Sequence, residues 1–188
     1  MSGETDEIIA SAVQAGDSER FAELIERYQG KLLRYARKFI LDPDDAEDIV
    51  QDVFVKAYQN INSFDAARRF SPWIYRIAHN EFVNEIKRRY ARRIVPVLDF
   101  DAMFPHLLAP DTADSVAVER DLRIALDAHL AELDPKYREP LILYYLEEMS
   151  YAEISDIMQI PVSTVGVRLA RARALLQKAA ADDPALQS

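Results

Sequence analysis

Residues 150–174 of this 188-residue chain predict two helices joined by a tight turn. Ser150 followed by Glu153 forms a capping box, in which a hydroxyl and a carboxylate each satisfy a backbone N–H at the start of a helix. Pro161 favours the end of that helix, because proline restricts the residue before it. Ser163 is expected to cap the second helix. The segment therefore predicts a helix-turn-helix, which can place its second helix in a DNA major groove.

Both helices of this segment have apolar residues at helical spacing, which predicts one buried face on each. These residues are Ile154, Ile157 and Met158 in the first helix, and Val165, Leu169 and Ala172 in the second. The second helix also carries three arginines, Arg168, Arg171 and Arg173. A plain helical hairpin with a solvated arginine face explains the segment about equally well, so its function depends on the rest of the chain.

The remaining composition predicts an all-α fold, because glycine is scarce, at 4 residues, and apolar residues follow helical periods along most of the chain. The absence of cysteine excludes disulfides and thiolate metal sites. No apolar run approaches the roughly 20 residues that span a bilayer, so we expect a cytoplasmic protein with no direct membrane insertion. The histidines stand apart from any acid–base or nucleophile arrangement, and we expect no catalytic residue, metal or cofactor.

The formal net charge of −9 argues against strong DNA binding by the free protein. The charge is unevenly distributed, because residues 87–93 are basic without any acid and residues 99–121 are mainly acidic. This pattern suggests a protein that touches DNA while a partner supplies much of the binding energy.

Four helices are predicted in the first half of the chain. The first covers residues 5–15, and Asp17 or Ser18 caps the second, which ends at Asp42 and Pro43. A capping box of Asp44 and Glu47 starts the third, over about 44–60. Pro72 at a first helical position starts the fourth, over about 72–92.

The loop over residues 62–70 and the fourth helix carry the groups that single-stranded DNA binding needs. Aromatic rings stack on bases, amides bond to base edges and cations meet phosphates. The candidate residues are Phe64 and Phe70 in the loop, and Asn80, Asn84, Lys87 and Arg88 on one helix face. Burial in the core is nevertheless the favoured reading for Phe70 and the nearby Trp73, and an inert surface is the alternative for the asparagines.

Residues 94–113 break the helical period and predict a linker, whose apolar residues are expected to dock onto a domain or a partner. A second domain is expected over residues 114–188. It contains a helix that ends near Leu133, a helix capped by Asp134 and Pro135, the helix-turn-helix and a frayed tail.

Three runs, over residues 45–64, 70–89 and 133–176, resemble bacterial extracytoplasmic-function sigma factors of the sigma-70 superfamily. The resemblance implies a four-helix sigma-2 type domain over 1–93, joined by a flexible linker to a helix-turn-helix sigma-4 type domain over 114–188. It also implies a dissociable subunit of RNA polymerase that directs promoter recognition and opening, without catalysis.

The resemblance implies three sets of site residues and their partners. The set for the promoter −10 element is Phe64, Phe70, Asn80, Asn84, Lys87, Arg88 and Arg89. The set for the −35 element is Ser163, Thr164, Arg168, Arg171 and Arg173. The set for the β′ clamp of core polymerase is Asp48, Gln51, Asp52 and Phe54. The helices before residue 163 correspond to those that dock on the β flap, and an anti-sigma factor is the expected regulator.

One departure from the family concerns Gly166 and Val167, where many members carry Arg and Ser. A glycine at this point costs about 1 kcal/mol of helix propensity against alanine and removes a donor, so the −35 sequence cannot be copied from relatives. A free-standing helix-turn-helix regulator that binds duplex operators as a dimer is the alternative function. It leaves the loop aromatics, Asn80 and the basic run unused.

Overall fold

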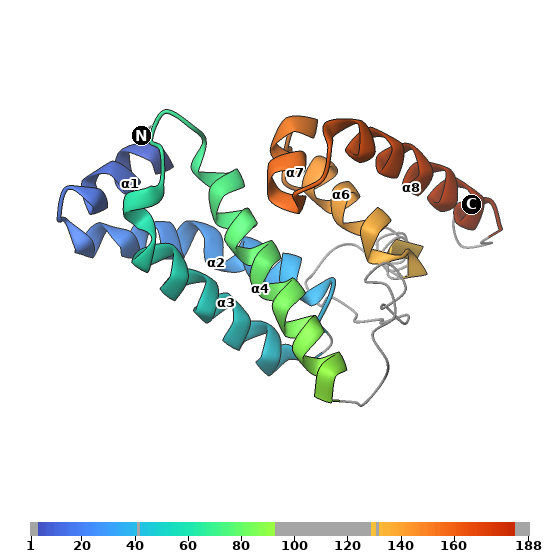
Figure 1. Ribbon diagram of the computed structural model, residues 1–188, viewed down its shortest axis with the longest axis horizontal. Coiled ribbons are helices and arrows are strands. Elements are labelled where there is room, and N and C mark those ends of the chain that lie inside the picture. The colour runs from blue at the N-terminus through green and yellow to red at the C-terminus, as the bar shows by residue number, and fades with distance from the viewer. Residues whose placement is uncertain (1–3, 41, 93–128, 131, 183–188) are drawn as a thin grey trace, which may run out of the picture. The chain divides into compact units, whose positions relative to one another are not determined.

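The computed structural model describes residues 4–40, 42–92, 129–130 and 132–182, and every regular element in these ranges is helical (Figure 1). The all-α prediction is therefore confirmed for this part of the chain. The chain divides into two compact units, the first mainly before and the second mainly after residue 95.

Two predicted segments lie wholly or largely outside the described residues. The linker predicted over 94–113 lies outside the described residues, as does most of the helix predicted between 114 and 133. The predicted domain boundaries therefore stay predictions.

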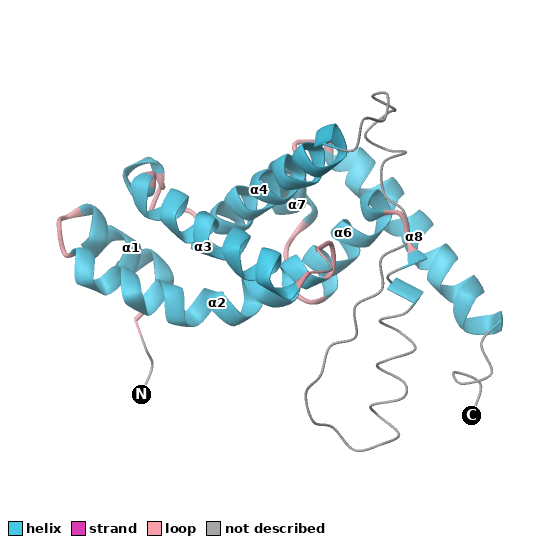
Figure 2. Ribbon diagram, turned by 90° about the horizontal axis from the view of Figure 1, so that it is seen from below, coloured by secondary structure: helices cyan, strands magenta, loops and turns pink. Residues whose placement is uncertain are grey.

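The described part of the first unit is built from four helices and two 3₁₀ turns. Its elements are α1 (Asp6–Gln14), the 3₁₀ turn η1 (Ser18–Arg20), α2 (Phe21–Arg37), α3 (Pro43–Gln59), the 3₁₀ turn η2 (Ile61–Ser63) and α4 (Phe70–Arg92). Helix α3 packs against both α2 and α4, while α1 lies along α2 and reaches η2 (Figure 2). The largest fully buried side chains here are Tyr28, Tyr35, Tyr75, Phe70, Ile9, Leu24, Leu32 and Ile74.

The start of α3 differs from the prediction by one residue. The Asp42 carboxylate caps the helix, because it accepts hydrogen bonds from the backbone N–H groups of Asp44 (3.0 Å) and Asp45 (3.3 Å). Pro43, which lacks an N–H, occupies the first helical position. The predicted capping box of Asp44 and Glu47 is therefore wrong. Helix α4 also begins earlier than predicted, at Phe70.

The second unit contains α6 (Pro135–Tyr145), α7 (Tyr151–Met158) and α8 (Val162–Asp182), and α6 packs against α8. The Asp134 carboxylate caps α6 by accepting from the Lys136 N–H at 3.0 Å, as predicted. Arg138 is buried, and burial lowers its pKa to about 10.

The helix-turn-helix forms much as the sequence predicts. The Ser150 N–H donates to the Glu153 carboxylate at 2.7 Å and the Glu153 N–H donates to the Ser150 hydroxyl at 3.3 Å, which confirms the capping box. The predicted core residues of both helices are buried, namely Ile154, Ile157, Met158, Val165, Leu169 and Ala172.

The end of α7 and the start of α8 differ from the prediction. Gln159, with φ of 54°, ends α7 in the left-handed conformation, one residue before the predicted break. The Pro161 carbonyl accepts from the N–H groups of Thr164 (2.9 Å) and Val165 (3.1 Å) and so opens α8. The predicted cap at Ser163 is wrong, because Ser163 lies inside the first turn.

The capping box should carry measurable stability. Ser150→Ala is expected to lower the free energy of unfolding of the second unit by about 1 kcal/mol, because an N–H at the start of α7 loses its acceptor. Urea unfolding followed by circular dichroism measures the change. The matched control is Ser163→Ala, an exposed serine, which should stay within about 0.5 kcal/mol of wild type. Equal losses in both variants would contradict a role for the box.

Within the described ranges, none of the helices has the length and apolar character needed to cross a bilayer. The same ranges hold no cluster of three or more acidic or histidine side chains arranged for a metal ion.

Candidate nucleic-acid interface

A pocket of about 510 Å³ opens on the first unit, between the segment around η2 and the start of α4. Its lining combines aromatic rings, amides and guanidinium groups with smaller polar side chains. The lining residues are Asn60, Ser63, Phe64, Asp65, Arg68, Trp73, Arg76, Ile77 and Asn80. Stacking surfaces, hydrogen-bonding amides and nearby cations are what a pocket needs to hold a nucleobase with its phosphate.

Three aromatic rings pack together beside this pocket. The ring centroids of Phe64 and Phe70 lie 5.3 Å apart, and each lies 5.4 Å from the ring of Trp73. Phe64 is 5% exposed and Phe70 is fully buried, so neither ring stands free for base stacking in this structure, and the favoured core position of Phe70 is confirmed. The two phenylalanine rings pack edge to face instead. Trp73, expected in the core, is partly exposed and lines the pocket.

One wall of the pocket comes from α4, where Trp73, Arg76, Ile77 and Asn80 are spaced three and four residues apart and share one side of the helix. Asn80 was predicted for this site, and Arg76 is a further lining residue that the sequence patterns did not indicate. The signal for Arg76 is its position four residues before Asn80, which is the same spacing that links Asn80 to Asn84.

The remaining candidates on α4 lie beyond the pocket. Asn84, Lys87 and Arg88 are exposed on later turns and are not among the lining residues. The Arg88 guanidinium forms an ion pair with Glu85 one turn earlier. The side chain of Arg89 lies outside the described part of the chain.

A second candidate surface lies on α8, on the side away from its buried residues. Thr164, Val167, Arg168 and Arg171 recur at intervals of three and four residues and so share one face. Val167 is 69% exposed and Arg171 is also exposed, while Thr164 and Arg168 are partly exposed. Ser163 is exposed at the start of the same helix. This face offers both cations and an apolar group to a partner.

Arg173 differs from the other two arginines. Its Nε donates to the Leu169 carbonyl at 3.2 Å and its Nη2 donates to the Tyr151 hydroxyl at 3.3 Å. The hydrogen bond to Tyr151 raises the pKa of Arg173. Tyr151 also lies beside Gly166, where an added Cβ would stand at an ordinary contact distance of 3.6 Å from the tyrosine ring.

The third candidate surface is the solvent face of α3, made of Asp48, Gln51, Asp52 and Val55, all of which are exposed. We call it the acidic face. Phe54 is only 7% exposed, because it falls on the opposite, buried side of α3. The place of Phe54 in the clamp set stays a prediction, and the exposed apolar residue at this surface is Val55.

Comparison with known proteins matches both units to one family. The model of sigma-70 region 2 matches residues 24–92, and the model of sigma-70 region 4 matches residues 123–176. The first match contains the pocket and the acidic face, and the second contains the face of α8.

The chain is 33% identical over 171 residues to the ECF RNA polymerase sigma factor SigW of Bacillus subtilis, covering 88% of this chain and 91% of that protein. It is similar to CnrH, solved in complex with the cytosolic domain of CnrY, with a TM-score of 0.69 and 28% identity over 96% of this chain and 99% of the other. The fold also matches that of the sigma factor RpoE of Bartonella quintana, solved with the anti-sigma factor NepR, with a TM-score of 0.66 and 24% identity over 85% and 95% of the two chains. The chain therefore belongs to the extracytoplasmic-function RNA polymerase sigma factors of the sigma-70 family.

Proposed function

We propose that this protein binds core RNA polymerase through its acidic face and opens promoters by holding a single-stranded −10 base in the pocket beside α4. The observation that carries the proposal is the pocket, because it joins Trp73, Asn80 and two arginines in one cavity. A base taken out of a duplex loses its stacking and pairing, and a ring and an amide can replace both. Arg68 and Arg76 supply positive charge for the adjoining phosphate.

The exposed face of α8 is proposed to contact the −35 element in the major groove. Arginines make the commonest specific contacts to guanine, and an apolar side chain such as Val167 fits the methyl group of thymine. Ser163, Thr164, Arg168 and Arg171 are the proposed polar contacts. Arg173 stays a weaker candidate, because its guanidinium is already bonded within the unit.

The acidic face is proposed to meet the β′ clamp of the polymerase, since carboxylates beside an apolar residue complement a basic helical partner. Helices α6 and α7 are proposed to dock on the β flap. The net charge of −9 then has a function, because it keeps the free chain off duplex DNA until polymerase carries it there.

An anti-sigma factor is the proposed regulator, because the sigma factor RpoE of Bartonella quintana, whose fold this chain matches, was solved with the anti-sigma factor NepR. We propose that the protein works in the cytoplasm without catalysis and without a cofactor, because promoter binding and opening need only the contacts described above.

Run-off transcription with core polymerase on a random promoter library tests the proposal and also recovers the preferred promoter. Transcripts that depend on the added protein are expected. Tight, specific duplex binding without polymerase, together with no effect on transcription, would instead favour a free-standing regulator.

Asn80→Ala is expected to reduce promoter opening on the recovered promoter by about 10-fold or more, because one good amide–base contact provides about 1–3 kcal/mol. Permanganate footprinting of unpaired thymines measures the opening. Asn84→Ala is the matched comparison on the same helix, and the larger loss is expected at Asn80, which lines the pocket. Affinity for core polymerase should stay near wild type in both variants. A loss of core binding would mean that this side of α4 meets polymerase instead of DNA.

A further inference from the structure

The segment that forms the outer wall of the pocket is held by a side chain from α1. The Gln14 Nε2 group donates to the carbonyl of Ile61 at 2.8 Å and to the carbonyl of Phe64 at 2.7 Å. Both bonds are partly buried and join residues 47 and 50 positions apart in the chain. The single amide of Gln14 therefore bonds to the first residue of the η2 turn and to the residue that follows the turn. Ser63 and Phe64, at the end of this segment, line the pocket.

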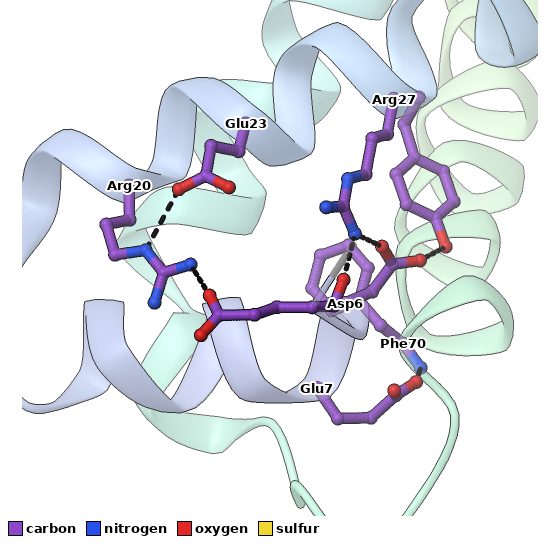
Figure 3. A network of polar contacts seen from close by, with 8 residues as sticks. Asp6, Glu7, Arg20, Glu23, Arg27 and Phe70 are labelled. Carbon is purple, nitrogen blue, oxygen red and sulfur yellow. Dashed lines mark hydrogen bonds and ion pairs between the residues drawn. The ribbon is translucent and has the colours of Figure 1, made fainter. Parts of the chain in front are cut away.

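The other end of the same segment is held by Glu7, two helical turns before Gln14. The Glu7 carboxylate accepts a hydrogen bond from the Phe70 N–H at 2.9 Å, as Figure 3 shows. Phe70 is the first residue of α4, so this carboxylate satisfies an N–H at the helix start and suits the positive end of the helix dipole. We call residues 61–70 the pocket loop, because Glu7 and Gln14 together bond to its first, middle and last parts.

Helix α1 is itself fixed to α2, so it can act as a rigid support. The Asp6 carboxylate accepts from the Arg27 guanidinium at 2.7 Å and from the Tyr28 hydroxyl at 2.5 Å (Figure 3). Burial is the main cause that raises the pKa of Tyr28, and the hydrogen bond to Asp6 raises it further. The Tyr28 hydroxyl therefore stays protonated and remains a donor. The Tyr28 ring in turn packs edge-on against Phe70, with 5.4 Å between centroids.

We propose that Glu7 and Gln14 are positioning residues that set the shape of the pocket and thereby control capture of a promoter base without touching DNA. The inference rests on the proposed function of the pocket. Both residues precede the segment matched to sigma-70 region 2, which begins at residue 24, so the support comes from outside the matched region. Recognition of a base requires its contacts to be placed within a fraction of an ångström, and a shift of about 1 Å can cost about 100-fold in a reaction.

Gln14→Glu is the variant that tests the proposal, because it keeps the shape of the side chain and replaces the donating amide with an oxygen facing two carbonyls. Promoter opening by the holoenzyme on the recovered promoter is expected to fall by at least about 10-fold, while affinity for core polymerase changes by less than about 2-fold. Ser11→Ala is the matched control, because it removes a 2.8 Å bond within α1 and leaves the bonds to the pocket loop intact.

Glu7 provides a rescue series. Glu7→Gln retains an acceptor for the Phe70 N–H and is expected to open the promoter about as well as wild type, whereas Glu7→Leu is expected to resemble Gln14→Glu. A role in general stability would instead lower core affinity and promoter opening together in Gln14→Glu and Glu7→Leu, and this result would overturn the proposal.

Trp73 reports on the pocket in the absence of DNA and polymerase, since it is the one tryptophan in the chain and lines the cavity. Acrylamide quenching of its fluorescence in the full-length protein is expected to increase in Gln14→Glu and to stay unchanged in Ser11→Ala. Wild-type quenching and wild-type opening in Gln14→Glu would overturn the inference. Failure of the wild-type protein to support any transcription would overturn the proposed function, while quenching would still test the support of the loop.

Discussion

Replacing Asp48 and Asp52 together with arginine is expected to reduce the affinity of this protein for core RNA polymerase by at least about 100-fold. The acidic face is proposed to meet a basic helix, and placing like charges together across an interface costs several kcal/mol. A loss of about 2.8 kcal/mol corresponds to 100-fold in the dissociation constant. Both aspartates are exposed in the interior of α3, where arginine is a good helix former, so the variant should fold normally.

Competition for core polymerase against labelled wild-type protein measures this affinity. The control is Glu19→Arg with Glu26→Arg, which changes the net charge by the same amount at two exposed positions before and within α2. The control should bind core polymerase within a few-fold of wild type. Equal losses in both proteins would show that overall charge governs association, and normal binding by the aspartate variant would place the clamp contact elsewhere.

The second large effect is expected at α8, where Arg168→Ala and Arg171→Ala should each weaken promoter binding by the holoenzyme about 10- to 100-fold. Each arginine that bonds to a base edge provides about 1–3 kcal/mol, and loss of a phosphate contact lowers the salt dependence of binding by about one unit of slope. Binding measured at several salt concentrations therefore separates the two roles. A variant that has lost a base contact discriminates less between promoters, while a variant that has lost a phosphate contact binds all promoters more weakly.

Arg173→Ala is the comparison for this experiment, because it removes a guanidinium from the same helix. Its two bonds within the second unit predict a loss of stability and a smaller direct effect on promoter binding. If Arg173→Ala weakened promoter binding more than Arg168→Ala and Arg171→Ala, the proposed DNA face of α8 would be wrong.

The sequence predicted those parts of the fold that depend on local spacing. The Ser150–Glu153 box and the buried stripe of Val165, Leu169 and Ala172 follow from contacts within a few residues, and both were confirmed. The error at α3 was also local, because Asp42 and Asp44 both suit a cap. Pro43 distinguishes the two aspartates, because proline favours the first helical position and so indicates that the residue before it, Asp42, is the cap.

The pocket could be predicted only in part, because its walls come from two segments. Periodicity assigns a buried face within a helix but says little about aromatic residues in a loop, so it predicted neither the burial of Phe64 nor the partial exposure of Trp73. The bonds from Glu7 and Gln14 were missed for a related reason. Each joins a polar side chain to a backbone group of an apolar residue 47 to 63 positions away, and no pattern along the chain pairs them before the helices are packed.

The space between Gly166 and the Tyr151 ring can accept a side chain, and this affects how the promoter preference of such a protein can change during evolution. At position 166 a new side chain meets the tyrosine ring at an ordinary 3.6 Å contact, and replacing glycine inside a helix adds stability of up to about 1 kcal/mol. A single codon change could therefore add a DNA-contacting group to α8 without loss of folding, and natural selection could in this way redirect the factor to a new set of genes.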